Sequence, residues 1–219
     1  MVTAHWETNL PMFSGNAKTS MIYDFGGFPE ALYKINYPAP GAPDIAAQAQ
    51  ALLKGAGLTA GIDGCRGVDH GTWVPLLKMY PDADVPIVQL SVQTAMNPRH
   101  HVDVGRALAP LTKEGVLIVG SGHLTHNLRD WMMSRGDATH APYAVKFQRW
   151  VFDRLAAHDV DALAAYRQQA PDAVRAHPTE EHFLPLFVAL GAAGPDTEPK
   201  RVFAGFEGNA LVMDAYRFG

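Results

Sequence analysis

The sequence contains a single cysteine, Cys65, in 219 residues. One cysteine excludes an intrachain disulfide and a zinc cluster built from cysteine ligands. Basic residues are also scattered, with no basic run longer than a dipeptide and a formal net charge of −4. Proteins that bind nucleic acid carry concentrated positive charge, so we expect no nucleic-acid partner.

Long hydrophobic runs are missing as well. No apolar stretch approaches the roughly 20 residues that a membrane-spanning helix needs. The first residues, Met1 to His5, show neither the cationic start nor the apolar segment of a secretory signal. We therefore expect a cytoplasmic protein of a reducing compartment, with no membrane partner.

The patterning predicts a single α/β domain over residues 1–219. Hydrophobic residues make up 47% of the chain and charged residues 18%, which is enough for one core. Apolar runs at 86–92 and 115–119 are typical of buried strands, and residues 2–6 resemble the end of another. Helices are expected at 43–55, 70–80, 98–114, 143–158 and 179–190. This alternation predicts a mixed, mostly parallel sheet with helices on both faces and a site at the carboxyl ends of the strands.

Ten histidines are a surplus for a chain of this length, and four of them occupy similar positions. His5 and His126 follow predicted strands, whereas His70 and His182 open predicted helices with Asp69 and Thr179 as N-caps. Sites in α/β proteins assemble at such element ends. The spacing alone does not establish a metal site, because no H-E-x-x-H pattern is present. Chance convergence is the alternative at this point.

The remaining histidines and the aromatic segment at 22–29 have simpler interpretations. We expect His100 and His101 to be solvated, and His158 and His177 to be ordinary polar residues at element ends. The segment Ile22-Tyr23-Asp24-Phe25-Gly26-Gly27-Phe28-Pro29 predicts a fixed loop. It is either a packed surface loop or a rim of aromatic rings over a flat ligand.

Six segments, in the same order along nearly the whole chain, resemble the class III extradiol ring-cleaving dioxygenases, in the branch similar to DOPA dioxygenase. They are Ala4-His5-Trp6, Tyr23 to Pro29, Tyr37 to Gly41, Asp69-His70-Gly71-Thr72-Trp73, Gly120-Ser121-Gly122 with Thr125-His126-Asn127-Leu128, and Glu181 to Pro185. Each segment alone is a weak signal, but six in register are specific.

The resemblance implies a non-haem Fe(II) enzyme that opens a catechol-type ring with dioxygen. Zn(II) is expected as a substitute in purified protein. The positions matching His5 and His182 are metal ligands in the family, and the position matching His126 is the acid/base histidine, sometimes assigned to the metal as well. The position matching His70 faces substrate and dioxygen. Tyr23, Phe25, Trp73 and His123 are the expected substrate-binding residues.

The sequence departs from this family at its start. The family begins with a strand leading into a Gly-His-Gly-Ser-Pro loop whose histidine is the first metal ligand, and no such motif occurs here. We expect the natural gene to encode roughly 35 to 45 further residues upstream, the size of one βα unit. Without that unit, the chain is expected to bind iron weakly, to use His123 as a substitute ligand, or to pair its exposed sheet edge in a homo-oligomer.

Two other functions remain open. A Memo-type binding protein of the same fold would lack dioxygenase activity, and the missing first motif favours it. The intact segments around His70 and His126 argue against it. A zinc-dependent hydrolase could use the same histidines, with Glu180 or Glu181 as the only nearby carboxylate base.

Overall fold

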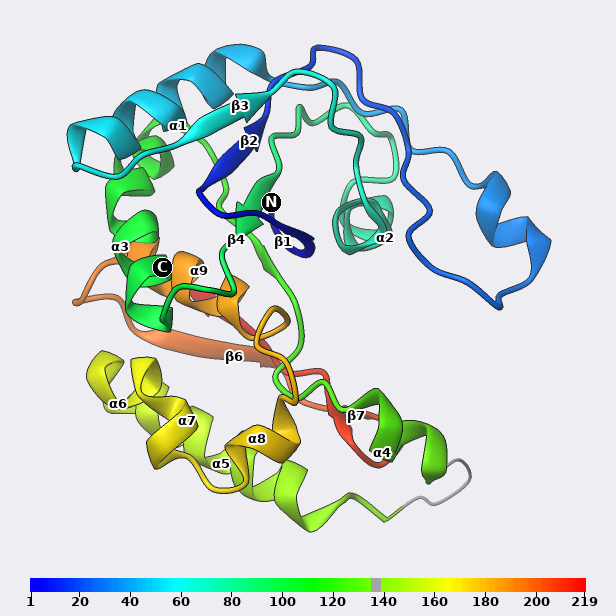
Figure 1. Cartoon of the computed structure of the whole chain (residues 1–219), viewed down its shortest axis with the longest axis vertical. Helices are drawn as coiled ribbons and strands as arrows, with labels where there is room; N and C mark the ends of the chain where they lie inside the picture. The colour runs from blue at the N-terminus through cyan, green and yellow to red at the C-terminus, as the bar shows by residue number, and fades with distance from the viewer. Residues whose placement is uncertain (135–138) are drawn as a thin grey trace.

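Five strands form one mixed sheet at the centre of the molecule, in the order β3-β2-β4-β1-β5 (Figure 1). The computed structural model describes residues 1–134 and 139–219. β1 pairs in parallel with β4 and β5, and β2 pairs in parallel with β3 and antiparallel with β4. The expected α/β fold with a mostly parallel sheet is therefore confirmed. The strands are β1 Val2–Glu7, β2 Met12–Ser14, β3 Gly61–Asp63, β4 Leu90–Val92 and β5 Gly120–Ser121.

Helices flank this sheet, and a second helical layer lies below it in Figure 1. α1 (Pro43–Gly55) packs on β2 and β3, α9 (Leu184–Ala193) on β1 and β5, and α2 (His70–Met79) on β1. α3 (Pro98–Leu108) lies along α9. The lower layer contains α5 Pro142–Ala156, α6 Val160–Ala164, α7 Tyr166–Gln169 and α8 Ala173–Ala176, and α4 Leu128–Met133 lies beside it.

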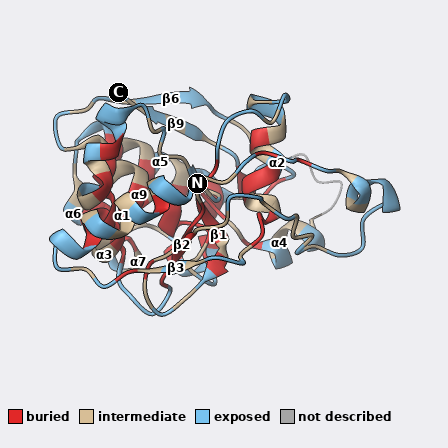
Figure 2. Ribbon diagram, turned by 90° about the horizontal axis from the view of Figure 1, so that it is seen from above, coloured by how far each residue is buried: buried red, intermediate tan, exposed pale blue. Residues whose placement is uncertain are grey.

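The core forms where α3 and α9 meet the sheet and the lower layer. α9 is apolar around most of its circumference and buries Leu184, Phe187 and Val188. Phe147 of α5 and Tyr166 of α7 are fully buried against it. Figure 2 shows these buried elements beside an exposed projection that carries the 3-10 helix Glu30–Lys34. No helix in the described ranges is long and apolar enough to cross a membrane.

The carboxyl-terminal residues form two small antiparallel pairs beside the core. β6 (Pro199–Phe203) pairs with β9 (Ala215–Phe218), and β7 (Phe206–Glu207) pairs with β8 (Leu211–Val212) between them.

The apolar run at 115–119 is not the buried central strand that its composition predicts. Only Gly120–Ser121 pair with β1, and this strand lies at the edge of the sheet. Leu117 is 61% exposed. Its neighbours line a groove of about 780 Å³ that also includes side chains of α2, α9 and β9. The run is apolar because it faces this groove, not because strands cover it on both sides.

Prolines move two helix boundaries from their predicted positions. α9 begins at Leu184, so His182 precedes the helix instead of lying within its first turn. Pro185 has no N–H and its ring clashes with the carbonyl four residues earlier, which prevents a helix from starting at Thr179. Likewise, α3 ends at Leu108, and the 3-10 helix Ala109–Glu114 continues the chain past Pro110.

His101, which was expected to be solvated, is buried, and so is His177, which was expected to be an ordinary polar residue at an element end. The Nε2 atom of His101 accepts a hydrogen bond from the backbone N–H of Gln93, and the side chain is 1% exposed. His177 is fully buried, with Nε2 2.8 Å from the carbonyl oxygen of Leu124 and its ring stacked on Phe183. Burial lowers the pKa of His101 to about 4 and that of His177 to about 3. Both side chains are therefore neutral in the folded protein near pH 7.

These buried histidines make the fold sensitive to acid. The unfolded chain takes up protons below a pKa of about 6.5, whereas the folded chain does so only near pH 3 to 4. The contribution of each buried histidine to the free energy of unfolding is therefore full above pH 6.5. It falls as the pH drops from 6.5 to 5, by about 2 kcal/mol at most for each histidine. Urea unfolding of the metal-free protein should show this slope, and His177→Gln should make it shallower. An unchanged slope in that variant would contradict the assignment.

A second expectation concerns Gly122, which follows β5 and lies close to the segment before α9. A Cβ atom on Gly122 would lie 2.1 Å from the carbonyl oxygen of His182, which is closer than real contacts permit. Gly122→Ala should therefore destabilise the fold by about 1–3 kcal/mol, as overpacking does elsewhere. Thermal unfolding measures the loss. Gly64→Ala is the matched control, because nothing lies within 4 Å of a Cβ atom there.

Candidate metal centre

The turn that follows β5 is fixed by backbone hydrogen bonds on both sides. The N–H groups of His123 and His126 donate to the carbonyl oxygens of His182 and Ala176, both at 2.8 Å. On the other side, Leu124 N–H donates to the Val212 carbonyl of β8 at 3.2 Å. These bonds leave the turn little freedom, so the positions of the two histidine side chains are set by the fold.

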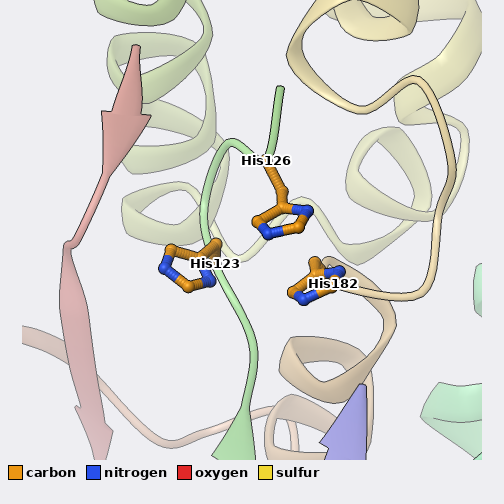
Figure 3. Close-up of side chains that lie close together, drawn as sticks. All are labelled: His123, His126 and His182. Atoms are coloured by element: carbon orange, nitrogen blue, oxygen red, sulfur yellow. The ribbon is translucent and has the colours of Figure 1, made fainter. Parts of the chain in front are cut away.

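The side chains of His123, His126 and His182 lie close together beside this turn (Figure 3). One ring nitrogen of each lies within 4.8 Å of the other two, which is a separation that a bound metal ion can bridge. The His126 and His182 rings stack at 3.4 Å with 13° between their planes. The His123 ring lies 5.1 Å from that of His126.

A carboxylate orients His182 within this group. Glu181 Oε1 lies 3.0 Å from His182 Nδ1 and also accepts a hydrogen bond from the Thr179 hydroxyl at 2.9 Å. Burial opposes ionisation of Glu181, but these hydrogen bonds outweigh it and lower its pKa. An ionised carboxylate only accepts hydrogen bonds, so Nδ1 of His182 carries the proton and Nε2 is the free ligand atom.

A second group, formed by His5, Asp24 and His70, adjoins the first. Asp24 lies 2.9 Å from His70 Nδ1 and 3.5 Å from His5 Nδ1. The His5 ring is 3.9 Å from that of His70 and 5.0 Å from that of His182. The two groups therefore form one continuous cluster of imidazoles, which we call the histidine cluster: His5, His70, His123, His126 and His182.

Three members of the histidine cluster are held neutral. Burial, followed by the neighbouring imidazoles, lowers the pKa of His5 and of His123 to about 4 and that of His126 to about 3. A neutral imidazole can bind a metal ion or accept a proton, whereas imidazolium can do neither. At pH 7 these side chains are in the form that either role requires.

The donor set fits a divalent transition metal. Imidazole suits iron, zinc and copper, and a cluster with carboxylates behind it resembles known metal sites. Nδ1 of His123 is buried without a hydrogen-bond partner among the described residues. A buried polar atom without a partner is costly, and a ligand bound at the cluster would remove that cost.

The strand that carries His5 is stabilised by an ion pair between Arg66 and the fully buried Asp69. The Asp69 carboxylate accepts a hydrogen bond from the Thr3 hydroxyl at 2.8 Å and pairs with Arg66 at 3.0 Å. Arg66 also donates to the carbonyl oxygen of His5. Asp69 is the residue preceding α2, as expected, but its side chain turns into the core and does not cap the helix.

The aromatic loop lies against the histidine cluster on the side of α2. The Phe25 ring is 5.6 Å from the His70 ring in an edge-to-face arrangement, and the Tyr23 ring is 6.2 Å from Phe25. Trp73 is 2% exposed and lies behind both rings, with its indole N–H bonded to the Ile22 carbonyl. Of the expected substrate-binding residues, His123 belongs to the histidine cluster and Phe25 contacts His70, whereas Tyr23 and Trp73 pack on Phe25.

Sequence reasoning selected all five members of the histidine cluster but missed their carboxylate partners. Asp24 stood out only as part of an aromatic loop, and Glu181 only as a candidate hydrolase base. A signal was available in both cases: Glu181 precedes His182 directly, and Asp24 is a single acidic residue between two aromatic ones.

Comparison with known proteins agrees with this geometry. Residues 1–213 match the family model described as the catalytic LigB subunit of aromatic ring-opening dioxygenase. The chain is 42% identical over its whole length to a protein of Beta vulgaris named 4,5-DOPA dioxygenase extradiol, covering 81% of it. It is 40% identical to the protein of that name in Escherichia coli strain K12, again covering 81%.

A solved structure supports the fold as well. The crystal structure of an uncharacterized Escherichia coli K12 protein superposes with a TM-score of 0.84 at 34% identity, covering the whole of this chain and 84% of that one. With a fold, a histidine cluster and relatives that all agree, the chain belongs to the LigB family of extradiol aromatic ring-opening dioxygenases, in the branch similar to DOPA dioxygenase.

Proposed function

We propose that residues 1–219 form one catalytic domain that cleaves a catechol-type ring beside its diol, using Fe(II) and dioxygen. The observation that carries this proposal is the histidine cluster, in which imidazoles from β1, the turn after β5 and the segment before α9 lie close together. The names of the relatives make a DOPA-like catechol the first substrate to test.

His5, His182 and His126 are the proposed metal ligands, with His123 close enough to complete the set. When bound, the iron lowers the pKa of a catechol hydroxyl and supports electron transfer from the substrate to dioxygen. Glu181 holds Nδ1 of His182, so that the opposite nitrogen faces the centre of the cluster.

The proposed acid/base groups are His70 and His126. A neutral imidazole within reach of the substrate can take a hydroxyl proton and return it when the ring opens. His70 lies beside His5 and beneath the edge of Phe25, where a flat substrate would meet it. His126 stacks on His182, so we assign it to the metal set and to proton transfer until variants separate the two roles.

The geometry disfavours a zinc hydrolase. Among the described residues, the carboxylate in contact with His182 is Glu181, whose Oε1 accepts from His182 Nδ1 and from the Thr179 hydroxyl. A general base acts on a water molecule at the metal, whereas Glu181 contacts His182 through Nδ1, the nitrogen opposite the one free for a metal.

The direct test is oxygen uptake by the iron-loaded protein. The protein is loaded with Fe(II) without air and mixed with a panel of catechols that includes DOPA, and then air is admitted. We expect oxygen consumption and a yellow ring-opened product. A panel that gives neither, with iron shown to be bound, would favour a binding protein of the same fold.

Two variants should separate metal binding from proton transfer. His126→Gln should lose bound metal and activity together, because its ring belongs to the set of close nitrogen atoms. His70→Gln should retain metal and lose about 100-fold in kcat, within the range for a missing acid/base group. Metal content by elemental analysis and steady-state kinetics give the two readouts. Loss of metal in His70→Gln would place His70 among the ligands.

We also propose that the chain forms a homo-oligomer through the edge of the sheet at β5. Among the described strands, none covers the outer side of β5, and Leu117, Met79 and Val202 are exposed around the groove there. An open edge with apolar neighbours favours pairing with another chain. Sedimentation velocity over a range of concentrations tests this, and a monomer at all concentrations would contradict it.

A further inference from the structure

Asp24 is the residue that connects the aromatic loop to the histidine cluster. Its Oδ1 lies 2.9 Å from His70 Nδ1 and accepts the backbone N–H of His70 at 3.0 Å. Its Oδ2 lies 3.5 Å from His5 Nδ1. Each carboxylate oxygen of Asp24 thus faces a different imidazole ring, and in both rings the nitrogen that faces it is Nδ1.

The loop delivers this carboxylate from a fixed backbone. The Tyr23 hydroxyl donates to the Ile35 carbonyl at 2.6 Å, and the Trp73 indole N–H donates to the Ile22 carbonyl. The Asp24 side chain is only 24% exposed. A partly buried carboxylate on an anchored loop can hold its partners in one orientation, which a mobile surface residue cannot do.

The chemistry of the contact selects one tautomer. An ionised carboxylate has no proton to donate, so the Nδ1 of His70, at hydrogen-bond distance from Oδ1, carries the hydrogen. The 3.5 Å contact of Oδ2 with His5 Nδ1 favours the same tautomer of His5. In the neutral form of each ring, Nε2 is then the nitrogen without a hydrogen. Metal-binding histidines commonly have such a partner, which fixes both ring orientation and tautomer.

We propose that Asp24 is a positioning residue that orients His5 for the metal and His70 for the substrate through their Nδ1–H groups. This inference rests on the proposed function, and it adds that one loop residue sets two histidines with different tasks. The rival explanation is that His5, Asp24 and His70 are themselves ligands of a second metal ion, since their ligand atoms lie within 4.8 Å of one another.

The first test replaces the carboxylate with an amide of the same shape. Asp24→Asn offers one acceptor and one N–H donor, so it cannot accept from both imidazoles and favours the opposite tautomer for one of them. We expect Zn(II) affinity, measured by competition with a chromophoric chelator, to fall about 10- to 100-fold, the range for partners behind metal ligands. The same variant of the iron-loaded enzyme should lose about tenfold or more in kcat with KM for catechol nearly unchanged.

The matched control is Asp159→Asn. Asp159 is a partly exposed carboxylate that pairs with Arg154 and caps α6 through Oδ1. Asparagine keeps this capping oxygen. Asp159 lies in the lower helical layer, before α6, so the Zn(II) affinity and kcat of this variant should equal those of the unaltered protein. Thermal unfolding of both variants shows whether either change simply disrupts the fold.

The second test reads the tautomers directly and does not depend on dioxygenase activity. Long-range proton–nitrogen NMR of the metal-free protein should show His5 and His70 protonated on Nδ1, with assignments from single histidine variants. Asp24→Asn should move at least one of them to Nε2–H. If both are already Nε2–H in the unaltered protein, the proposal is wrong.

Metal stoichiometry separates the proposal from its rival. The unaltered protein and Asp24→Asn should both bind one Zn(II) per chain, the variant more weakly. Two ions in the unaltered protein and one in the variant would make Asp24 a ligand and overturn the positioning role. Absence of ring cleavage by the unaltered protein would refute the proposed function but leave the affinity and tautomer results as a test of Asp24.

Discussion

The structure depends on the close backbone contact between the turn after β5 and the segment before α9. His123 N–H donates to the His182 carbonyl, and Gly122 lies against that same carbonyl so closely that no side chain fits. This contact brings together residues about 60 positions apart in the chain. It determines the distance between the His123, His126 and His182 rings, because all three leave the backbone at or beside the contact.

Once the backbone brings the imidazoles together, electrostatics decides which forms of them can coexist. Several protonated imidazoles within about 5 Å would repel one another strongly in a partly buried space. Burial and mutual proximity instead keep His5, His123 and His126 neutral. Two carboxylates also contact the histidine cluster, Asp24 at His70 and Glu181 at His182, and their negative charge suits a cation bound there.

The sequence predicted which helices and strands form better than where they begin and end. It identified the cluster histidines but not the carboxylates that contact them. The helix at 43–55 and the parallel arrangement follow from periodicity and proline placement, which are local signals. The prediction for the run at 115–119 was wrong because an apolar strand and an apolar groove wall have the same composition. The prediction that His101 is solvated was wrong, and the burial of His177 at the end of α8 was not predicted, because burial of a histidine depends on carbonyl and amide partners that only the tertiary fold supplies. The cluster histidines came from ordered motifs, and no spacing rule would have joined His5 to His182.

Asp24 connects the aromatic loop to the histidine cluster, so this loop is more than an apolar surface. Phe25 contacts the His70 ring, and the preceding residue holds the same ring by its nitrogen. If a substrate packs on Phe25, as we propose, it contacts the loop whose Asp24 faces His70 and, through the second carboxylate oxygen, His5. The loop is anchored at Tyr23 and Trp73, so it cannot shift to accommodate a ligand without moving Asp24. Under the proposed function, an acidic residue between two aromatic ones thus couples substrate binding at Phe25 to the orientation of His70 and His5.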